Sequence, residues 1–448
     1  MDLDSGDHAR VLALLRRHGW NSTSFQVLEP GFRYWFDGDD ACVGYVDTGS
    51  AWVVAGPPIA PIERVAEVSQ RFVDAAHAAH RRTAWFGTEE RFRDATTWPA
   101  LRIGDQPMWD PSAWPKVVES SKSLREQLRR ARAKGVTVRA VALDELAVGH
   151  ATRVQVDTLI ERWLASRPIA PMGFLVQIDP FTFPNERHYF VAEREGRVVA
   201  FLGIIPVYAR AGWFFEDFLR DPDAPNGTIE MLVDAGMRAA AAEHVPLVTL
   251  GLVPLSGDVS SSLRAARRLG RSLYDFDGLR AFKAKFKPRD WDPIFLSYPP
   301  GGNAFVAVFD TLKAFARGGL LQFGLETLLR GPAVVVRAFA ALLVVWTALL
   351  ALPMSERFFP STAWQYGWVG FDVVLGAALF TLAHRWRRGL ADIVAAAVTA
   401  DAVLTILQSI VYDLPRRRGV LDIFFLVVAI AGPILASLLM WNARAHRT

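Results

Sequence analysis

The chain has 448 residues, 51% of them hydrophobic, with a mean hydropathy of +0.18 and a net charge of +4. The length allows two or three domains and excludes a small disulfide-stapled module. The composition is far too apolar for a disordered chain and slightly too apolar for an ordinary soluble enzyme. The mild positive charge is compatible with nucleic acid or anionic lipid as a partner but identifies neither.

The chain contains one cysteine, Cys42, which excludes an internal disulfide and a cysteine-based zinc site. Cys42 lies in an apolar stretch, so we expect a small buried side chain rather than a nucleophile. The N-terminus is acidic and lacks an apolar core, so we expect no secretory signal.

Residues 9–298 carry short strand and helix patterns that are typical of a mixed α/β fold. We assign residues 1–120 to a first lobe, in which a helix follows three strands and precedes a fourth. Its elements are expected at Ala9–Gly19 (helix), Phe32–Phe36, Ala41–Val46, Ala51–Ala55, Ile62–Ala79 (helix) and Arg82–Gly87.

A second lobe, residues 121–300, begins with a basic helix and repeats the general order of strands, helix and strand. Its other elements are expected at His150–Ser166 (helix), Tyr189–Ala192, Val198–Ile205, Ala211–Phe218, Gly227–Glu243 (helix) and Pro246–Leu252. The shared order predicts a duplicated α/β lobe, although no strong sequence repeat relates the two halves.

Residues 301–330 form an amphipathic connector after the second lobe. Phe305, Phe309, Leu312 and Phe315 are spaced so that they lie on one face of a helix. Such a helix can lie at a membrane interface or pack on the soluble region, and the sequence leaves both interpretations open.

The remainder, residues 331–448, predicts a helical membrane domain with about four transmembrane helices. Four segments, approximately 332–352, 364–384, 389–412 and 420–441, approach the ~20 apolar residues that cross a bilayer. The positive-inside rule places the loop after the second segment (Arg385, Arg387, Arg388) and the end of the chain (Arg444, Arg447) in the cytoplasm, together with residues 1–330. Arg416, Arg417 and Arg418 contradict this orientation. The third segment, which carries Asp392 and Asp401, is either re-entrant or turns these acids toward a polar interior.

The basic helix at Ser121–Gly135 places Arg125, Arg129 and Arg132 on one face, because they are four and three residues apart. This face predicts contacts with tRNA phosphates or anionic headgroups, and a solvated surface is the alternative.

Acids and an arginine end the strand Ala211–Phe218, just before a turn rich in proline, asparagine and glycine. Functional residues are common where strands give way to loops. Asp217 and Glu230 are candidates for binding a substrate ammonium, and Arg220 for holding a phosphate or a carboxylate. A salt bridge at the strand end, with helix capping, is the alternative interpretation. Ser256, in the loop Leu250–Gly257, lacks the context of a hydrolase nucleophile.

Lys283 and Lys285 alternate with Phe282 and Phe286, which predicts a strand with one cationic face. That face is suited to a phosphate or a developing oxyanion, and a basic edge strand is the alternative. We find no Walker loop, no His-Glu-x-x-His motif and no clear phosphate loop for acetyl-CoA. We therefore expect no cofactor and no metal.

Taken in order, several stretches resemble one family, the catalytic domain of aminoacyl-phosphatidylglycerol synthases. These are the phosphatidylglycerol lysyltransferases of bacterial multiple peptide resistance proteins. The resemblance covers roughly residues 10–298. It is carried by Lys122–Arg125 with Gly135, Trp163-Leu164 with Met172–Phe174, Phe190–Glu193, Asp217–Arg220 with Pro222–Thr228, Leu250–Gly257 and Gly278–Pro288.

The resemblance implies two tandem GNAT-like acyltransferase lobes that move an amino acid from aminoacyl-tRNA to a lipid hydroxyl. It implies catalytic roles for Asp217 and Arg220, which match an Asp-x-x-Arg pair, and for Lys283, which matches a functional lysine. Residues expected to bind substrate are Glu230 (in place of the more usual Asp), Asn226, Arg280, Lys285, Asp292 (near the position of a family glutamate) and Phe174.

We therefore expect an enzyme of the bacterial cell membrane, with a cytoplasmic catalytic region, that transfers an amino acid, most simply lysine, to phosphatidylglycerol. Its partners would be aminoacyl-tRNA and an anionic phospholipid. An aminoacyl ester is already activated, so positioning and charge stabilisation suffice and no covalent intermediate is needed. An acyl-CoA-dependent N-acyltransferase and an inert lipid- or partner-binding membrane protein are the alternatives. Two departures from the family stand out: its large N-terminal flippase region is missing, and the apolar segments lie C-terminal instead.

Overall fold

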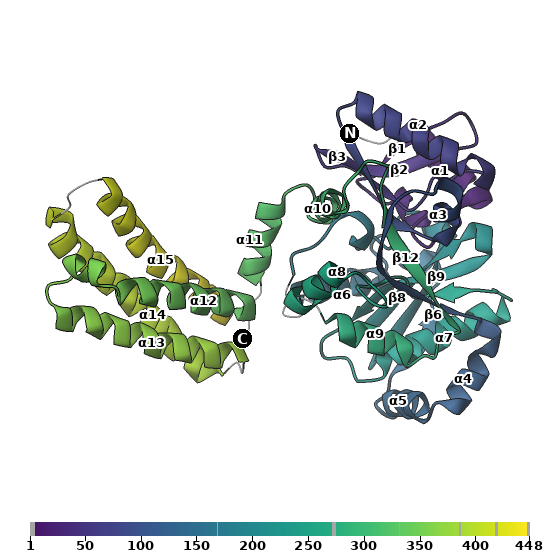
Figure 1. The fold of residues 1–448 in the computed structure, drawn as a ribbon. Helices are drawn as coiled ribbons and strands as arrows, with labels where there is room; N and C mark the ends of the chain where they lie inside the picture. Colours follow the sequence, from purple (N-terminus) through teal and green to yellow (C-terminus); the bar gives the residue numbers. More distant parts are fainter. Residues whose placement is uncertain are drawn as a thin grey trace. The chain divides into compact units, whose positions relative to one another are not determined.

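The computed structural model describes residues 5–167, 169–270, 275–330, 332–384, 387–416 and 420–445 (Figure 1). Arg385, Arg417, Arg418 and Arg447, on which the predicted orientation partly depends, lie outside the described residues. The chain forms two compact units. One contains Met1–Ser166 and Pro171–Leu320, and the other contains Arg167–Ala170 and Leu321–Thr448. The predicted connector 301–330 is therefore divided at Leu320.

A twelve-stranded mixed sheet runs through the whole first unit, in the order β1-β2-β3-β4-β12-β5-β10-β9-β8-β7-β6, with β11 paired to β5. The two predicted lobes thus share one sheet, and the mixed α/β prediction is confirmed. The strands are β1 (Arg33–Phe36), β2 (Cys42–Asp47), β3 (Ala51–Ala55), β4 (Arg82–Thr88), β5 (Ala100–Trp109), β6 (Thr137–Ala140), β7 (His188–Arg194), β8 (Arg197–Val207), β9 (Gly212–Arg220), β10 (Val248–Thr249), β11 (Val253–Pro254) and β12 (Asp290–Ser297).

The last strand crosses the predicted boundary at residue 120. β12 comes from the segment assigned to the second lobe, yet it pairs antiparallel with both β4 and β5 of the first lobe. The strands of the first predicted lobe are therefore joined by a strand from the second.

Helices of the first unit cover this sheet (Figure 1). They are α1 (Ser5–His18), α2 (Val65–Ala78), α3 (Glu90–Thr96), α4 (Trp114–Ser120), α5 (Lys122–Ala133), α6 (Ala151–Ala165), α7 (Thr228–Ala242), α8 (Ser261–Gly270), α9 (Phe276–Ala284) and α10 (Ala304–Phe315). The strand predicted around Phe282–Phe286 is wrong, because Phe282 and Lys283 lie on α9. The Asp275 side chain caps this helix by accepting a hydrogen bond from the Gly278 amide.

Cys42 lies on β2 in the core of the first unit and is completely buried, as predicted. Burial raises the pKa of its thiol to about 12. Because the thiolate is the nucleophilic form, a thiol this hard to ionise is a structural side chain.

The second unit consists of helices at the four predicted apolar segments. They are α12 (Pro332–Leu350), α13 (Thr362–His384), α14 (Arg388–Gln408) and α15 (Val420–Ala445), preceded by α11 (Leu320–Arg330). Two stretches, Thr362–Leu382 and Arg388–Arg416, are long and apolar enough to cross a membrane, and shorter apolar helices span Phe339–Leu350 and Ala429–Trp441. Helix α14 runs without a break past Asp392 and Asp401 and ends in a π-helical turn at Ser409–Asp413.

Candidate active site

An irregularity in strand β9 positions the central acids of the candidate site. Gly203 of β8 pairs with Asp217, whereas the next residue, Ile204, pairs with Phe215. Glu216 is thus an extra residue in β9, which defines a β-bulge. Bulges twist a strand locally and redirect side chains, and they are frequent beside active sites.

Glu216 and Asp217 belong to a buried group that we call the acidic cluster, formed by Glu29, Arg187, Glu216 and Asp217. The Arg187 guanidinium donates to Glu216 at 2.7 Å and to Glu29 at 3.2 Å. A third bond, to the Thr182 carbonyl at 2.8 Å, fixes its orientation. Glu29 lies in the first predicted lobe and the other three residues in the second, so the cluster joins the two.

The acidic cluster holds more negative charge than one guanidinium can neutralise. Burial and the neighbouring carboxylate of Glu216 raise the pKa values of Glu29 and Asp217 well above their ordinary range. Among the described residues, no donor makes a hydrogen bond to the Asp217 carboxylate, although this side chain is only 4% exposed. One oxygen of Glu29 and one of Glu216 are also buried without a partner. Such a site favours a bound cation or a retained proton.

No group of three or more His, Cys, Asp or Glu side chains in the described part of the chain is arranged to hold a metal ion.

Lys283 secures the segment that follows β10. Strands β10 and β9 pair in parallel at Val248–Trp213 and Thr249–Phe214, so their carboxyl ends meet at the same edge of the sheet as Asp217. The buried Lys283 amine donates to the carbonyls of Leu250, Gly251 and Leu252 at 2.6, 2.9 and 3.1 Å. These three acceptors use all three donors of an ammonium group. In this geometry Lys283 holds the segment that follows β10, and its role as a phosphate or oxyanion ligand stays a prediction. Burial lowers its pKa to about 7.

The structure brings together two predicted site residues, Arg220 and Asn226. The Arg220 guanidinium donates to the Ala224 carbonyl and, at 3.4 Å, to the side-chain oxygen of Asn226. Its Nε is buried without a partner, so one donor remains available for a ligand oxygen. The turn after β9 therefore presents a cation near the end of the strand that carries Asp217.

Glu230, in the first turn of α7, forms an ion pair with Lys285 at 2.5 Å. The Lys285 ammonium also lies over the rings of Phe282 and Phe286, at 4.1 and 5.0 Å from their centroids. The structure thus brings two predicted substrate-binding residues together, and each neutralises the charge of the other.

A second charged group, which we call the basic cluster, contains Arg102, Asp105 and Arg280. The buried Asp105 carboxylate accepts bonds from Arg102 at 2.5 and 3.1 Å, and Arg280 lies 3.5 Å away. Arg280 also stacks over the Trp291 ring at 4.5 Å. The amide of Asp105 donates to the hydroxyl of Ser256, which ties the loop after β11 to this cluster. Two guanidinium groups share one acid, so the excess charge is positive.

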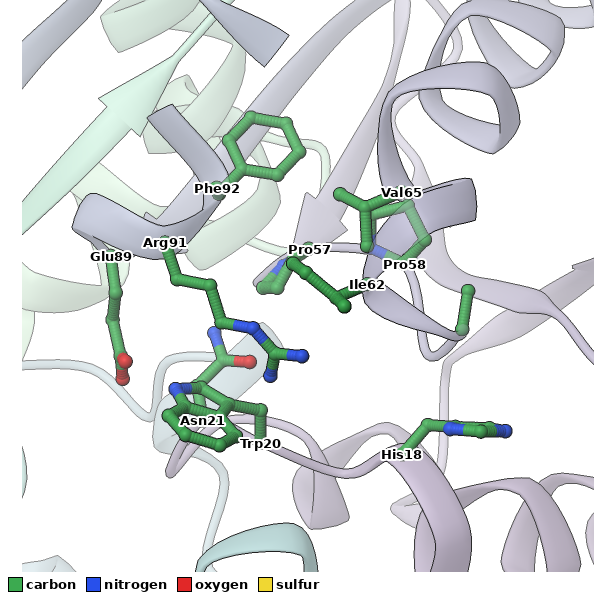
Figure 2. A pocket seen from close by; sticks show the side chains of 11 residues that line it. His18, Trp20, Asn21, Pro57, Pro58, Ile62, Val65, Glu89, Arg91 and Phe92 are labelled. Carbon is green, nitrogen blue, oxygen red and sulfur yellow. The ribbon is translucent and has the colours of Figure 1, made fainter. Parts of the chain in front are cut away.

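Asp292, on β12, is linked through Arg210 to Glu89, one of the residues that line a pocket of the first predicted lobe (Figure 2). Arg210 lies 3.9 Å from Asp292 and 3.7 Å from Glu89, which lines that pocket. The Arg91 guanidinium stacks on Trp20 at 4.1 Å across the pocket floor. Burial raises the pKa of Glu89 to about 7. Asp292 is therefore paired within the protein and belongs to a polar network that the sequence did not predict.

The three arginines predicted to bind phosphates from α5 each contact another group of the protein. Arg125 donates to carbonyls at the end of α4, Arg129 pairs with Glu126 at 2.8 Å, and Arg132 lies 3.6 Å from Asp234. All the same, the helix carries five basic residues against one acid: Lys122, Arg125, Arg129, Arg130 and Arg132, with Glu126, and its C-cap residue, Lys134, is a sixth. The surface stays cationic.

A family model for the C-terminal region of phosphatidylglycerol lysyltransferase matches residues 12–298 of the chain. The chain belongs to this family. The phosphatidylglycerol lysyltransferase of Bacillus subtilis (strain 168) is 25% identical over 321 residues, which are 68% of the chain and 37% of that protein. The lysylphosphatidylglycerol biosynthesis bifunctional protein LysX of Mycobacterium avium (strain 104) is 25% identical over 222 residues, which are 44% of the chain and 18% of that protein. The chain thus spans only part of the length of these relatives.

Two solved structures share the fold of the first unit. A C-terminal domain from Agrobacterium fabrum, assigned to a lysylphosphatidylglycerol synthetase, has a TM-score of 0.60 and 22% identity. It covers 71% of this chain, and the chain covers 99% of it. The L-PGS structure from Bacillus licheniformis has a TM-score of 0.58 and 21% identity, with 69% and 96% covered. The mixed α/β sheet of the first unit is therefore the architecture of the lysyltransferase family.

Phe174, which the resemblance to the lysyltransferase family predicts to bind substrate, packs in the hydrophobic core. Phe174 has a left-handed backbone (φ of 58°) and packs its ring against Phe32, Phe86 and Phe315, 5.3–6.1 Å between centroids. It belongs to a hydrophobic cluster that also includes Phe25 and Leu28. The structure places Phe174 in the hydrophobic core, and its role in substrate binding stays a prediction.

Sequence reasoning missed three members of the acidic cluster. Glu216 has a recognisable signal, since two adjacent acids inside an apolar strand require either a bulge or a buried partner. Glu29 and Arg187 have none, because they come together only when the two halves of the lysyltransferase sheet meet.

Proposed function

We propose that this protein transfers an aminoacyl group, most simply lysine, from aminoacyl-tRNA to the hydroxyl of a membrane phospholipid such as phosphatidylglycerol. Membership of the lysyltransferase family supports the reaction type. The observation that carries the proposal for this chain is the acidic cluster, in which three buried carboxylates surround one guanidinium. A lysyl group brings ammonium charge into such a site and relieves the excess of negative charge.

In the proposed reaction, the lipid hydroxyl oxygen attacks the ester carbonyl carbon of the aminoacyl-tRNA. A new ester bond forms to the lipid, and the bond from that carbon to the ribose oxygen of the tRNA breaks. The hydroxyl proton passes to Asp217 and then to the departing ribose oxygen, so the tRNA is released with its terminal hydroxyl restored. A carboxyl whose pKa is raised toward neutrality is suited to both transfers.

Glu29 and Glu216 would hold the ammonium charge of the amino acid while Asp217 handles the proton. Arg220, at the turn after β9, would orient an oxygen of the ester or of a phosphate. The basic cluster would hold a phosphate, because Arg102 and Arg280 keep donors beyond those used on Asp105. The α5 surface would contact the tRNA backbone, where basic residues bind without reading sequence.

We propose that the apolar helices α12–α15 anchor the chain in the bacterial cell membrane, with the first unit in the cytoplasm. The two helical stretches long enough to span a bilayer support an anchor. A cytoplasmic first unit follows from the reaction, since aminoacyl-tRNA is a cytoplasmic substrate. The Arg387 side of the second apolar segment agrees with this orientation.

The test uses membranes that contain the full chain, tRNA pools charged with labelled amino acids, and phosphatidylglycerol. Label that appears in extracted lipid and disappears on RNase treatment is the expected result, and the charged pool that yields it identifies the amino acid. A parallel arm replaces charged tRNA with labelled acetyl-CoA. Label from acetyl-CoA, or no lipid label beside an active control enzyme, would overturn the proposal.

A further inference from the structure

Helix α10 (Ala304–Phe315) is fixed to the first unit by one of its faces (Figure 1). Arg82 of β4 makes a two-point contact with the buried Asp310 carboxylate, at 2.7 and 2.8 Å. Lys313 donates to the Ser50 hydroxyl at 2.8 Å. The remaining inward residues, Ala307, Thr311 and Ala314, are small and buried. The helix therefore cannot roll without breaking an ion pair and exposing its packed face.

Both ends of α10 are also held. The Asn303 side chain caps the first turn by accepting from the amides of Phe305 and Val306. At the other end, the Phe315 ring packs edge-on against Phe86 and Phe174, and its carbonyl accepts a bond from the Gly173 amide at 2.9 Å. Three of the residues that hold α10 (Ser50, Arg82 and Phe86) come from the β3–β4 region, so the helix is a rigid part of the catalytic body.

The opposite face of α10 is apolar and uncovered within the first unit. Phe305 is 76% exposed, and Phe309 and Leu312 are each 51% exposed. Their spacing of four and three residues aligns them in one stripe. Val306 widens the stripe and is also exposed. Isolated exposed apolar residues are common, but two phenylalanines and a leucine in line on a rigid helix mark an interaction surface.

We propose that this stripe, Phe305, Phe309 and Leu312, lies in the interfacial layer of the lipid bilayer and docks the first unit on the membrane. The inference rests on the membrane anchor proposed above. Only residues 316–331 separate α10 from α12, and most of them form the helix α11 (Leu320–Arg330). At ~1.5 Å per helical residue and ~3.3 Å per extended residue, this connection spans at most roughly 33 Å, which keeps α10 within about the thickness of the hydrocarbon core of an inserted α12. Aromatic and leucine side chains are the residues that interfacial helices bury at this depth.

Docking at this place would orient the proposed active site. The inner face of α10 contributes Ala314, and Phe315 packs on the same hydrophobic cluster, which also contains Phe25 and Leu28. Glu29 of the acidic cluster follows Leu28 directly. One continuous core thus supports the membrane-facing helix on one side and the acidic cluster on the other. The angle at which the first unit meets the lipid would be set by packing and not by a flexible linker.

The experiment uses the full chain carrying Cys42→Ala, reconstituted in vesicles of phosphatidylglycerol and phosphatidylcholine. Single cysteines at Phe305→Cys, Phe309→Cys and Leu312→Cys carry an environment-sensitive fluorophore. Quenchers are doxyl lipids, with the nitroxide either near the headgroup or deep in the acyl chain, and a soluble nitroxide. Glu195→Cys, in the exposed turn between β7 and β8, provides the water-facing control. Val374→Cys, exposed on α13, reports on the membrane anchor.

The expected result is severalfold stronger quenching of the three stripe labels by the shallow doxyl lipid than by the soluble nitroxide, with the reverse at Glu195→Cys. Val374→Cys should be quenched by the deep lipid. If Val374→Cys responds to lipid but the stripe labels respond to the soluble nitroxide, the docking inference is wrong and the anchor stands. Stripe labels shielded from all three quenchers would mean that protein covers the face, which also overturns it. Loss of lipid quenching at Val374→Cys would overturn the anchor itself.

Discussion

The acidic cluster has two members on β9 and the basic cluster has two on β5 of the same sheet, and their charges are unbalanced in opposite directions. Three carboxylates surround Arg187, whose side chain is 0% exposed. Asp105 is equally buried but is shared by Arg102 and Arg280, whose side chains are 31% and 41% exposed. In the first cluster the excess charge is enclosed, where only a ligand or a proton can neutralise it. In the second it faces outward, where solvent screens it until an anion binds.

The two clusters are joined by the segment that Lys283 holds. Its carbonyls at Leu250–Leu252 follow β10, which pairs with β9 of the acidic cluster. The next residues, Val253 and Pro254, pair with Asp105 and Gly104 beside the basic cluster. The difference between the clusters suggests a division of labour, in which the enclosed acids receive the amino acid and the open arginines receive a phosphate.

The sharpest test of the comparison is a pair of matched substitutions, Asp217→Asn and Asp105→Asn. Asp217→Asn should lower lipid aminoacylation by about 10²–10⁴-fold, because it removes the group proposed to move the proton. It should leave the Tm unchanged or raise it, since it removes one of three crowded charges. Asp105→Asn should lower the Tm instead, because it leaves two arginines without their acid. Transfer assays and thermal unfolding of both variants give the answer, and full activity in Asp217→Asn would contradict the catalytic role.

Removing a guanidinium group from the acidic cluster should destabilise the protein more than removing one from the basic cluster. Arg187→Met leaves buried carboxylates uncompensated and should cost about 3–5 kcal/mol in the free energy of unfolding. Arg102→Met, on the exposed side of the other cluster, should cost about 1 kcal/mol or less. Chemical denaturation of the two variants measures the difference. Equal losses would show that the acidic cluster is protonated and neutral in the folded protein.

The enclosed acids also predict a pH dependence of stability. The folded-state pKa values of Glu29 and Asp217 are raised, so above about pH 4 the folded state retains protons that the unfolded state has lost. Stability should therefore fall as the pH rises from about 4 through the folded-state pKa values. In Asp217→Asn this slope should be shallower. If the unfolding free energy of the wild type instead rises over this pH range, and Asp217→Asn shows the same slope, the raised pKa values of Glu29 and Asp217 would be contradicted.

Lys283→Met tests whether this residue positions the linking segment. Loss of three buried carbonyl contacts should cost about 2 kcal/mol in unfolding free energy. If Lys283 acts only through position, Lys283→Arg should recover part of the stability and part of the transfer activity together. A variant with normal stability and no activity would instead restore the direct catalytic role that the sequence predicted.

The smallest effects are expected at the outer surface. Arg280→Ala should raise the KM for the phosphate-bearing substrate about tenfold with little change in kcat, since the lost contact serves binding. Arg129→Ala on α5 should weaken tRNA binding and reduce its salt dependence by about one charge. Titrations at several salt concentrations distinguish these effects. A change in kcat alone for Arg280→Ala would move the basic cluster from binding to chemistry.

The sequence predicts β1–β4 and β7–β10 and several amphipathic helices, because each has a buried face and a clear period. It misses β6, β11 and β12, and also β5, whose ten residues include Asp105, Gln106 and Pro107. That strand is central and buried, and it carries polar groups that pair with distant residues, so neither alternation nor an apolar run appears. The four C-terminal helices are found from hydropathy. Their number of membrane crossings stays a prediction.

The residues of the candidate site also differ in how well the sequence predicts them. Asp217, Arg220 and Asn226 are close in sequence, and local motif reasoning finds them. Lys283 is found by resemblance but with the wrong geometry, because alternation with phenylalanine suits a strand as well as one turn of helix. Arg187 and Glu29 are 158 residues apart, and only the assembled sheet brings them together.

The place of β12 has a consequence for biosynthesis. Residues 290–297 fill the gap between β4 and β5, so both strands keep an unpaired edge until this segment has left the ribosome. Open edges of this kind favour pairing with other chains. The first apolar helix, α12, begins at Pro332, soon after β12 ends at Ser297. Closure of the sheet and delivery to the membrane would then be nearly simultaneous, which limits the time that a soluble, half-built sheet spends in the cytoplasm.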